Sequence, residues 1–229
     1  REMFRIDLRH ITHRIEFRDF SEELTELAEI VVDEAVELSR AKLEGELTTP
    51  LLGNGLPLPW SLCALGKFGG RELGFGSDIE LVFVYGEEGA TPGSRMAESS
   101  HYFGELVRDF TRTLIARREG VFEIDLRLRP HGNAGALAPS LHGFRDYYSA
   151  GGAARQFERL ALVKLRPVSG DPALGSQVIE ARNAFVYSGH ALDVENILHL
   201  RQRQATELVS PGAVNAKYSP GGLVDLEYF

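Results

Sequence analysis

Two acidic side chains, Asp78 and Glu80, stand at the head of an apolar run that directly follows a glycine-rich stretch. Side chains alternate across a strand, so residues two apart point to the same face. Paired carboxylates hold hard divalent cations, and the backbone N–H groups of a glycine-rich loop are accessible to phosphate oxygens. The combination predicts metal-dependent chemistry on a nucleoside triphosphate.

A third acid, Asp125, belongs to a segment that alternates between apolar and polar residues from position 121 to 129. The alternation predicts a strand with one core face, whose other face carries Glu123, Asp125, Arg127 and Arg129. If this strand pairs with residues 79–85, Asp125 stands beside Asp78 and Glu80. Three carboxylates in one site repel one another unless cations bind there.

The candidates for phosphate contact lie in and beside the glycine-rich stretch. The backbone N–H groups of Gly69, Gly70 and Ser77 are favoured, because glycine permits close approach of a ligand. The alternative is a tight turn that needs positive φ. Lys67 is a further candidate or a solvated loop lysine. Arg127 and Arg129 share the face of Asp125, and they either neutralise it or contact phosphate and protein substrate; the sequence does not separate these roles.

The composition is that of an ordinary globular protein. The chain has 229 residues, 43% hydrophobic and 25% charged, and its net charge of −8 argues against general affinity for nucleic acid or anionic membranes. The one cysteine, Cys63, lies in an apolar run and indicates a buried thiol in a reducing, cytoplasmic compartment. The sequence contains neither an apolar run of membrane-spanning length nor a visible signal peptide.

Charge is unevenly distributed along the chain. Arginine and lysine outnumber the acids between positions 108 and 166, although the whole chain is acidic. Such a segment suits a small polyanion, and scattered solvated arginines explain it equally well.

Apolar periodicity predicts helices over 21–44, 94–118, 140–149, 153–165, 171–187 and 193–209, with another beginning near 223, and strands over 60–65, 79–85 and 121–129. Ser21 is expected to cap the first helix. The fold class is therefore α+β: a small mixed sheet with flanking helices, followed by a helical domain. Three regions are expected: an N-terminal helical segment (1–50), a catalytic core (51–168) and the start of the helical domain (169–229). Because the chain begins with Arg1 and stops inside an apolar pattern, we expect a fragment with a truncated helical domain.

With these elements in place, the chain resembles the DNA polymerase β-type nucleotidyltransferase superfamily. Within it, the chain is similar to the glutamine synthetase adenylyltransferase family. The similarity rests on four blocks in family order: 66–80 (GKFGGRELGFGSDIE), 123–130 (EIDLRLRP), 157–166 (FERLALVKLR) and 217–228 (KYSPGGLVDLEY). Several long, spaced matches are far more specific than a lone glycine motif.

The resemblance implies a polymerase β-like core that transfers AMP from ATP to a tyrosine of glutamine synthetase, or removes it by phosphorolysis. Mg²⁺ or Mn²⁺ would be held by Asp78, Glu80 and Asp125, and Asp125 would accept the proton of the attacking hydroxyl. Arg166 joins the candidates for phosphate binding. The implied partners are glutamine synthetase and a PII nitrogen-signalling protein, with neither nucleic acid nor membrane.

Two departures from the family pattern leave alternatives open. Glu80 stands where the family usually has aspartate, and one copy of the catalytic unit is present where the family carries two, one attaching and one removing AMP. The block from Lys217 to Glu227 favours the attaching half. The alternatives are a catalytically weakened unit that binds nucleotide or a signalling protein, and a nucleotidyltransferase with another acceptor.

Overall fold

A computed structural model describes residues 1–86, 94–114, 123–189, 191 and 193–228. Its centre is a four-stranded sheet in the order β3-β2-β1-β4. The strands are β1 (Trp60–Ala64), β2 (Ile79–Tyr85), β3 (Ile124–Asp125) and β4 (Arg166–Gly170). β1 is antiparallel to β2 and β4, whereas β2 and β3 are parallel. The small mixed sheet confirms the predicted α+β class.

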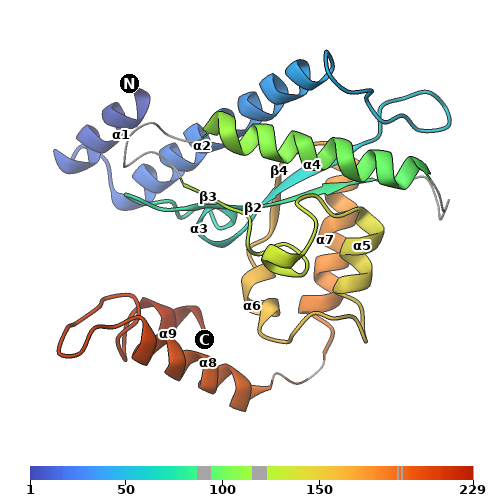
Figure 1. The fold of residues 1–229 in the computed structure, drawn as a ribbon. Coiled ribbons are helices and arrows are strands. Elements are labelled where there is room, and N and C mark those ends of the chain that lie inside the picture. The colour runs from blue at the N-terminus through green and yellow to red at the C-terminus, as the bar shows by residue number, and fades with distance from the viewer. Residues whose placement is uncertain (87–93, 115–122, 190, 192, 229) are drawn as a thin grey trace.

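Helices cover both faces of the sheet (Figure 1). One layer holds α1 (Glu2–Ile11), α2 (Phe17–Leu43) and α4 (Ser94–Leu114), and the other holds α5 (Leu141–Tyr147), α6 (Glu158–Leu162) and α7 (Pro172–Val186). A single turn, α3 (Gly66–Gly69), joins β1 to β2, and a 3₁₀ turn (Gly132–Ala134) follows β3. The chain continues into α8 (Val194–Glu207) and α9 (Leu223–Glu227).

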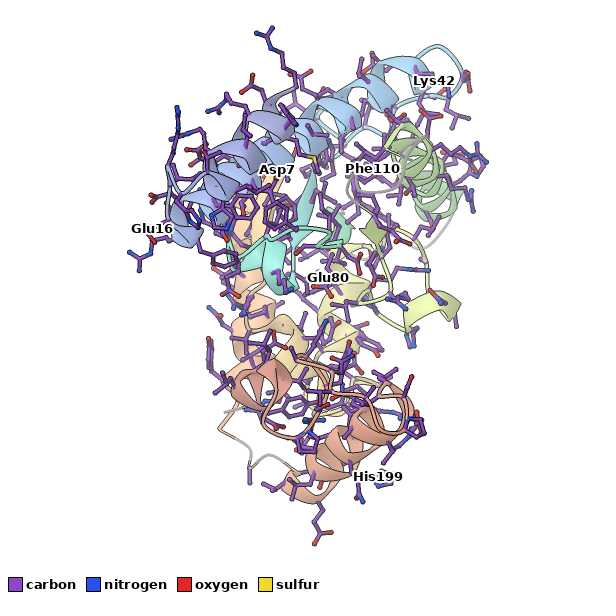
Figure 2. The ribbon with its side chains drawn as sticks, turned by 90° about the vertical axis from the view of Figure 1, so that its left-hand side faces the viewer. Asp7, Glu16, Lys42, Glu80, Phe110 and His199 are labelled. Atoms are coloured by element: carbon purple, nitrogen blue, oxygen red, sulfur yellow. The ribbon has the colours of Figure 1, made fainter. Side chains whose placement is uncertain are left out.

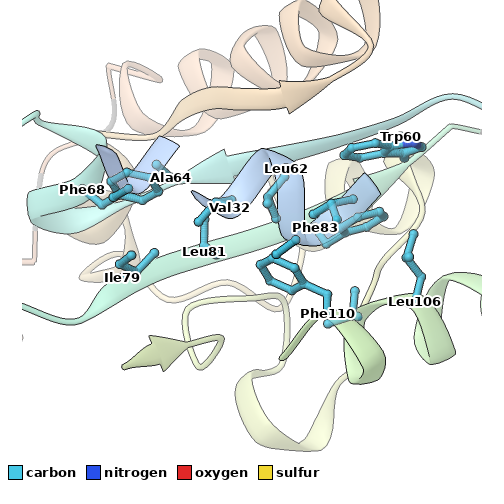
Figure 3. Packing of buried hydrophobic residues seen from close by; sticks show 14 of the residues in the cluster. Val32, Trp60, Leu62, Ala64, Phe68, Ile79, Leu81, Phe83, Leu106 and Phe110 are labelled. Atoms are coloured by element: carbon cyan, nitrogen blue, oxygen red, sulfur yellow. The ribbon is translucent and has the colours of Figure 1, made fainter. Parts of the chain in front are cut away.

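The central strand β2 is buried on both faces. Ile79, Leu81 and Phe83 face the cluster under α2 and α4 (Figure 3), while Val82 and Val84 face the cluster under α5 and α7. Burial on both sides explains why the strand reads as an unbroken apolar run. Each large side chain contributes about 1.5–3 kcal/mol by leaving water, so the register of this strand is tightly fixed.

That register decides where Glu80 points. Glu80 lies two residues before Val82, so it shares the face of β2 that looks toward the layer of α5, α6 and α7. Figure 2 places Glu80 at the level of the sheet, between the α1–α2 layer and the segment that carries α8 and α9. The carboxylate of Glu80 therefore lies on the side of the sheet that α5, α6 and α7 cover.

The first long helix begins earlier than the sequence predicted. α2 starts at Phe17 with Glu16 as its N-cap, so the prediction of Ser21 as the cap is wrong. Ser21 is buried inside the helix, and α1 precedes it where no element was predicted. The reason is the aromatic pair Phe17 and Phe20, which extends the apolar face by a further turn.

The strand predicted over 121–129 is shorter. Positions 121–122 lie outside the described residues, as do 115–118 at the predicted end of α4, and β3 ends at Asp125. The carboxylate of Asp125 accepts a hydrogen bond from the backbone N–H of Arg127 (2.8 Å). Such a local bond turns the chain away from the sheet.

Strand β4 was missed, because residues 153–165 were predicted as a helix with Arg166 at its end. The helix α6 is only five residues long, and Arg166–Gly170 form an edge strand with a register shift against β1. A strand of sequence Arg-Pro-Val-Ser-Gly carries little β signal, and its proline is tolerated because the strand lies at the sheet edge.

Helix α7 packs against β1 and β4. α8 and α9 form their own pair through an ion pair of Arg201 with Asp225 (2.5 Å). The boundary between the catalytic core and the helical domain, placed at residue 168 from the sequence, stays a prediction. No helix among the described residues has both the length and the apolar character needed to cross a bilayer.

An aromatic cluster of α1, α2 and the glycine-rich loop supplies a stability prediction. Phe20 is fully buried and lies 4.6 Å, between ring centroids, from both His10 and Phe75. Phe20→Ala should lower the free energy of unfolding by about 3–5 kcal/mol, the usual cost of an emptied aromatic site. Phe17→Ala is the matched control, because Phe17 belongs to the same cluster but is 58% exposed. Urea unfolding measures both, and equal losses would contradict the assignment.

Candidate active site

The three predicted acids meet at one end of the sheet. Asp78 is exposed directly before β2, Glu80 lies within β2, and Asp125 is the register partner of Glu80 across the parallel pair. The pairing of the two strands is as predicted. Burial raises the pKa of Glu80 most, and the charge of Asp125, then that of Asp78, raises it further.

Asp125 already has a cationic partner. The Arg127 guanidinium lies 2.6 Å from Oδ2 of Asp125, and its Nε lies 3.0 Å from both carboxylate oxygens. This ion pair holds the pKa of Asp125 below its usual range. The side chain of Arg127 is nevertheless 70% exposed, so the pair opens directly to solvent. The ion pair fits the predicted role of neutralising Asp125, and contact of Arg127 with phosphate stays a prediction.

Glu80 is held by a glycine that sequence reasoning had not singled out for this purpose. Gly66 has a positive φ of +48°, and an ideal Cβ placed on it would lie 1.4 Å from Oε2 of Glu80. The backbone N–H of Leu65 also donates to the carbonyl oxygen of Glu80 (2.9 Å). The start of α3 and the carboxylate of Glu80 are therefore packed directly against each other.

Gly69 and Gly70, which were predicted to bind phosphate, stabilise the turn of α3 through backbone hydrogen bonds and close packing. The N–H groups of Gly69 and Gly70 donate to the carbonyl oxygens of Leu65 (2.7 Å) and Gly66 (3.0 Å). A Cβ on Gly69 would lie 2.1 Å from the carbonyl oxygen of Lys164, so glycine is required for close backbone packing. Phosphate binding here would require those bonds to open, and that role stays a prediction.

Ser77 and Lys67 flank the same turn. Ser77 is buried, and its Oγ accepts a hydrogen bond from the N–H of Gly74 (3.0 Å), which closes the loop immediately before Asp78. Within the described part of the chain, the amine of Lys67 has no ion-pair partner. Phosphate contacts by either residue stay predictions.

Arg166 ties the glycine turn to the rest of the protein. Its guanidinium donates to Glu29 of α2 (2.6 Å) and to the carbonyl oxygens of Phe68 (3.3 Å) and Gly69 (3.2 Å). It lies in strand β4, so the predicted helical position is wrong. Its contacts make it a support of the turn, and its predicted contact with phosphate stays a prediction.

Two hollows lie beside the segment that follows β3, and the larger of them is lined by two of the three acids. The larger, about 490 Å³, is lined by Asp78, Glu123, Ile124, Asp125, Leu126, Arg127, Arg129, Asn133 and Leu137. The smaller, about 230 Å³, is lined by Arg127, Leu128, Arg129, Gly132, Tyr147, Tyr148, Phe157, Glu158, Ala161 and Leu162. Both are lined by Arg127 and Arg129, but only the larger is lined by Asp78 and Asp125. Asn133, from the turn after β3, lines the larger hollow and was not among the predicted site residues.

The C-terminal segment also reaches the acids. The charge of Lys217 lowers the pKa of Glu80, opposing the larger effect of burial, and the charge of Glu227 raises it. Both residues come from the last sequence block used for the family resemblance. The segment around α9 thus adds a cation and a further carboxylate to the electrostatics of β2.

The donor chemistry of the three acids fits a divalent cation, but their present arrangement is not that of a formed metal centre. Within the described ranges, no group of three or more histidine, cysteine or acidic side chains is gathered closely enough to hold an ion. The reason lies in the contacts already given: Asp125 faces Arg127, and Glu80 is packed against Gly66. Burial raises the pKa of Glu80 most, and the neighbouring acids add to it, so a bound cation would offset part of the cost of ionising this side chain.

Comparison with known proteins identifies the family. A sequence model described as glutamate-ammonia ligase adenylyltransferase matches residues 1–181, which include the acids and the glycine turn. The chain belongs to this family.

Curated relatives agree with that assignment. The chain is 34% identical over 236 residues to the bifunctional glutamine synthetase adenylyltransferase/adenylyl-removing enzyme of Nitrosococcus oceani, covering 100% of the chain. It is 34% identical over 237 residues to the Pseudomonas putida enzyme of that name, and 35% over 235 residues to that of Xanthomonas campestris. The chain spans about a quarter of the length of these relatives, 24% in each case.

The contact of Gly66 with Glu80 yields a double-mutant test. Gly66→Ala should cost about 1–2 kcal/mol for the left-handed backbone and more for the displaced carboxylate. Gly55→Ala is the control, because Gly55 also has positive φ (+82°) but an added Cβ would meet no atom within 4 Å. Combining Gly66→Ala with Glu80→Ala should recover the excess cost, measured by urea unfolding. Strict additivity of the two substitutions would refute the contact.

The raised pKa of Glu80 predicts a pH dependence of stability. The folded state binds this proton more tightly than the unfolded state, so ionised Glu80 lowers stability above its folded pKa. The penalty fades as the pH falls through that pKa toward the ordinary value of 4.5 and is absent below it. Glu80→Gln should therefore be more stable than the parent chain at pH 7, with the difference shrinking on acidification. A difference independent of pH would argue against a perturbed carboxyl.

Proposed function

We propose that this chain is a nucleotidyltransferase unit that acts on a tyrosine of glutamine synthetase, either adding AMP from ATP with release of pyrophosphate or removing it with phosphate to give ADP. The observation that carries the proposal is the parallel pairing that brings Glu80 beside Asp125, with Asp78 at the same strand end. Membership of the adenylyltransferase family supplies the reaction class, and the names of the relatives supply the acceptor.

The acids would act as a unit. Asp78, Glu80 and Asp125 would hold Mg²⁺ or Mn²⁺, which supplies charge neutralisation for the triphosphate of ATP. Asp125 would also accept the proton of the attacking tyrosine hydroxyl. The ion pair of Arg127 with Asp125 must first break, since both carboxylate oxygens of Asp125 accept hydrogen bonds from the Arg127 guanidinium. The freed Arg127 would be available to a phosphate group, as would Lys67 and the turn of Gly69 and Gly70.

The compartment and the partners of this chain are part of the same proposal. We propose the cytoplasm as the compartment and glutamine synthetase as the principal partner, with a PII signalling protein as a second. We expect neither nucleic acid nor a membrane as a ligand, in keeping with the net charge of −8.

The test is AMP transfer by the chain from labelled ATP to purified glutamine synthetase in Mg²⁺ or Mn²⁺. Asp78→Asn and Asp125→Asn should each lower transfer about 100-fold or more while leaving the thermal unfolding midpoint nearly unchanged. Asp146→Asn is the control, because this exposed carboxylate pairs with His142 (3.0 Å) on α5. Full activity in either site variant would sink the proposal.

A second candidate function is favoured by one observation. Arg127 forms an ion pair with Asp125 that must break before this carboxylate can bind a metal, as expected of a unit that binds nucleotide for regulation and transfers AMP poorly. In that case ATP would bind to the parent chain with little transfer, and Glu80→Asp, which restores the residue usual in the family, would raise transfer. Efficient transfer by the parent chain would exclude this alternative.

A further inference from the structure

Arg129 is a buried cation that lacks a full set of partners. Only 7% of the residue is exposed, and its Nη1 donates to the carbonyl oxygen of Leu126 (2.6 Å). Its Nε is buried without any hydrogen-bond partner in the described structure, and no described carboxylate forms an ion pair with it. Burying a guanidinium in this way is costly unless something else completes its hydrogen bonds.

The nearest acid is already taken. Asp125 acts on Arg129 only through its charge, because its two oxygens accept hydrogen bonds from Arg127. Arg127 is exposed and engaged, whereas Arg129 is buried and incompletely engaged. An incoming anion would therefore meet at Arg129 a donor that need not first break an ion pair.

The position of Arg129 indicates where such an anion would lie. Arg129 lines both the 490 Å³ hollow beside Asp78 and Asp125 and the 230 Å³ hollow beneath Tyr147 and Tyr148. The small hollow is walled mainly by aromatic and aliphatic side chains, and its one carboxylate, Glu158, already accepts hydrogen bonds from the hydroxyl of Tyr147 and the N–H of Arg155. The larger hollow adjoins the carboxylates proposed to meet the triphosphate.

We propose that Arg129 binds a phosphate group of the nucleotide or of its polyphosphate product in the larger hollow. A guanidinium matches phosphate oxygens with a fixed fork of N–H donors, which a lysine does not reproduce. The inference deepens the proposed function and rests on it for the nature of the substrate. It assigns to Arg129 a phosphate contact that the sequence left open for both Arg127 and Arg129.

The experiment is calorimetric binding of ATP, pyrophosphate and adenosine to the chain in Mg²⁺ buffer. Arg129→Met should weaken ATP and pyrophosphate about 10- to 100-fold, as expected for lost hydrogen bonds to a charged group, and leave adenosine unchanged. Arg129→Lys should fall between Arg129→Met and the parent chain. Arg145→Met is the matched control: it removes one arginine charge from α5 at an exposed residue that lines neither hollow, and it should change each affinity less than about twofold.

The alternatives give different results. Weakening of adenosine with pyrophosphate unchanged would overturn the proposal in favour of contact with the nucleoside. Affinities in Arg129→Met equal to those in Arg145→Met would overturn it in favour of a structural role. Absence of pyrophosphate and ATP binding by the parent chain would overturn it outright.

A measurement on the unmodified chain covers the case in which Arg129→Met fails to fold. The ¹⁵N resonance of Arg129 Nε, assigned by its loss in Arg129→Lys, should move as pyrophosphate is added. A resonance that stays in place at saturation would refute the contact. The result is separable from the acceptor question: phosphate binding that depends on Arg129, without transfer to glutamine synthetase, retains this inference and removes the proposed acceptor.

Discussion

The parallel pairing of β2 with β3 is the constraint on which the rest of the site depends. It fixes Glu80 opposite Asp125 in a strand buried on both faces, so the two negative charges cannot move apart without unpacking the sheet. Two nearby cations partly offset the repulsion between these charges. Arg127 pairs directly with Asp125, while Lys217 acts through space on Glu80.

The two paired carboxylates meet opposite environments. Arg127 lowers the pKa of Asp125, whereas burial and neighbouring charge raise that of Glu80. Environments that drive two acids apart in this way are characteristic of sites where one group keeps its charge and another exchanges a proton or a cation. The ionised carboxylate of Glu80 lowers the stability of the fold, and its packing against Gly66 keeps it in this unfavourable position.

The elements that sequence reasoning found are those with strong local patterns. β1 and β2 are apolar on both faces and bounded by loops, so their extents were predictable within a residue. β4 was not, because its five residues hold one proline and one glycine and its pairing with β1 is settled by contacts more than 100 residues away. The approach of Asp125 to the acid pair followed from alternation, and the α+β class from the mixture of periods.

The side-chain partners were harder to foresee than the acids themselves. A sequence shows that Arg127 shares a face with Asp125, but not whether it pairs with the acid or faces solvent. Gly66 must lack a Cβ because the carboxylate of Glu80 occupies that space. Glu80 lies on another element, so the sequence around Gly66 does not reveal this requirement. Arg129 lay on the predicted polar face, and only the folded chain shows that this face turns inward at its position.

The contacts of Arg166 and Lys164 also set an order of assembly. The glycine turn at 66–70 is completed by carbonyl contacts and packing from residues almost 100 positions later in the chain. These contacts form only after a long loop has closed, and the entropy lost in closing it slows their formation. During synthesis, the apolar strands can therefore collapse early, while the geometry around Glu80 waits until β4 has emerged.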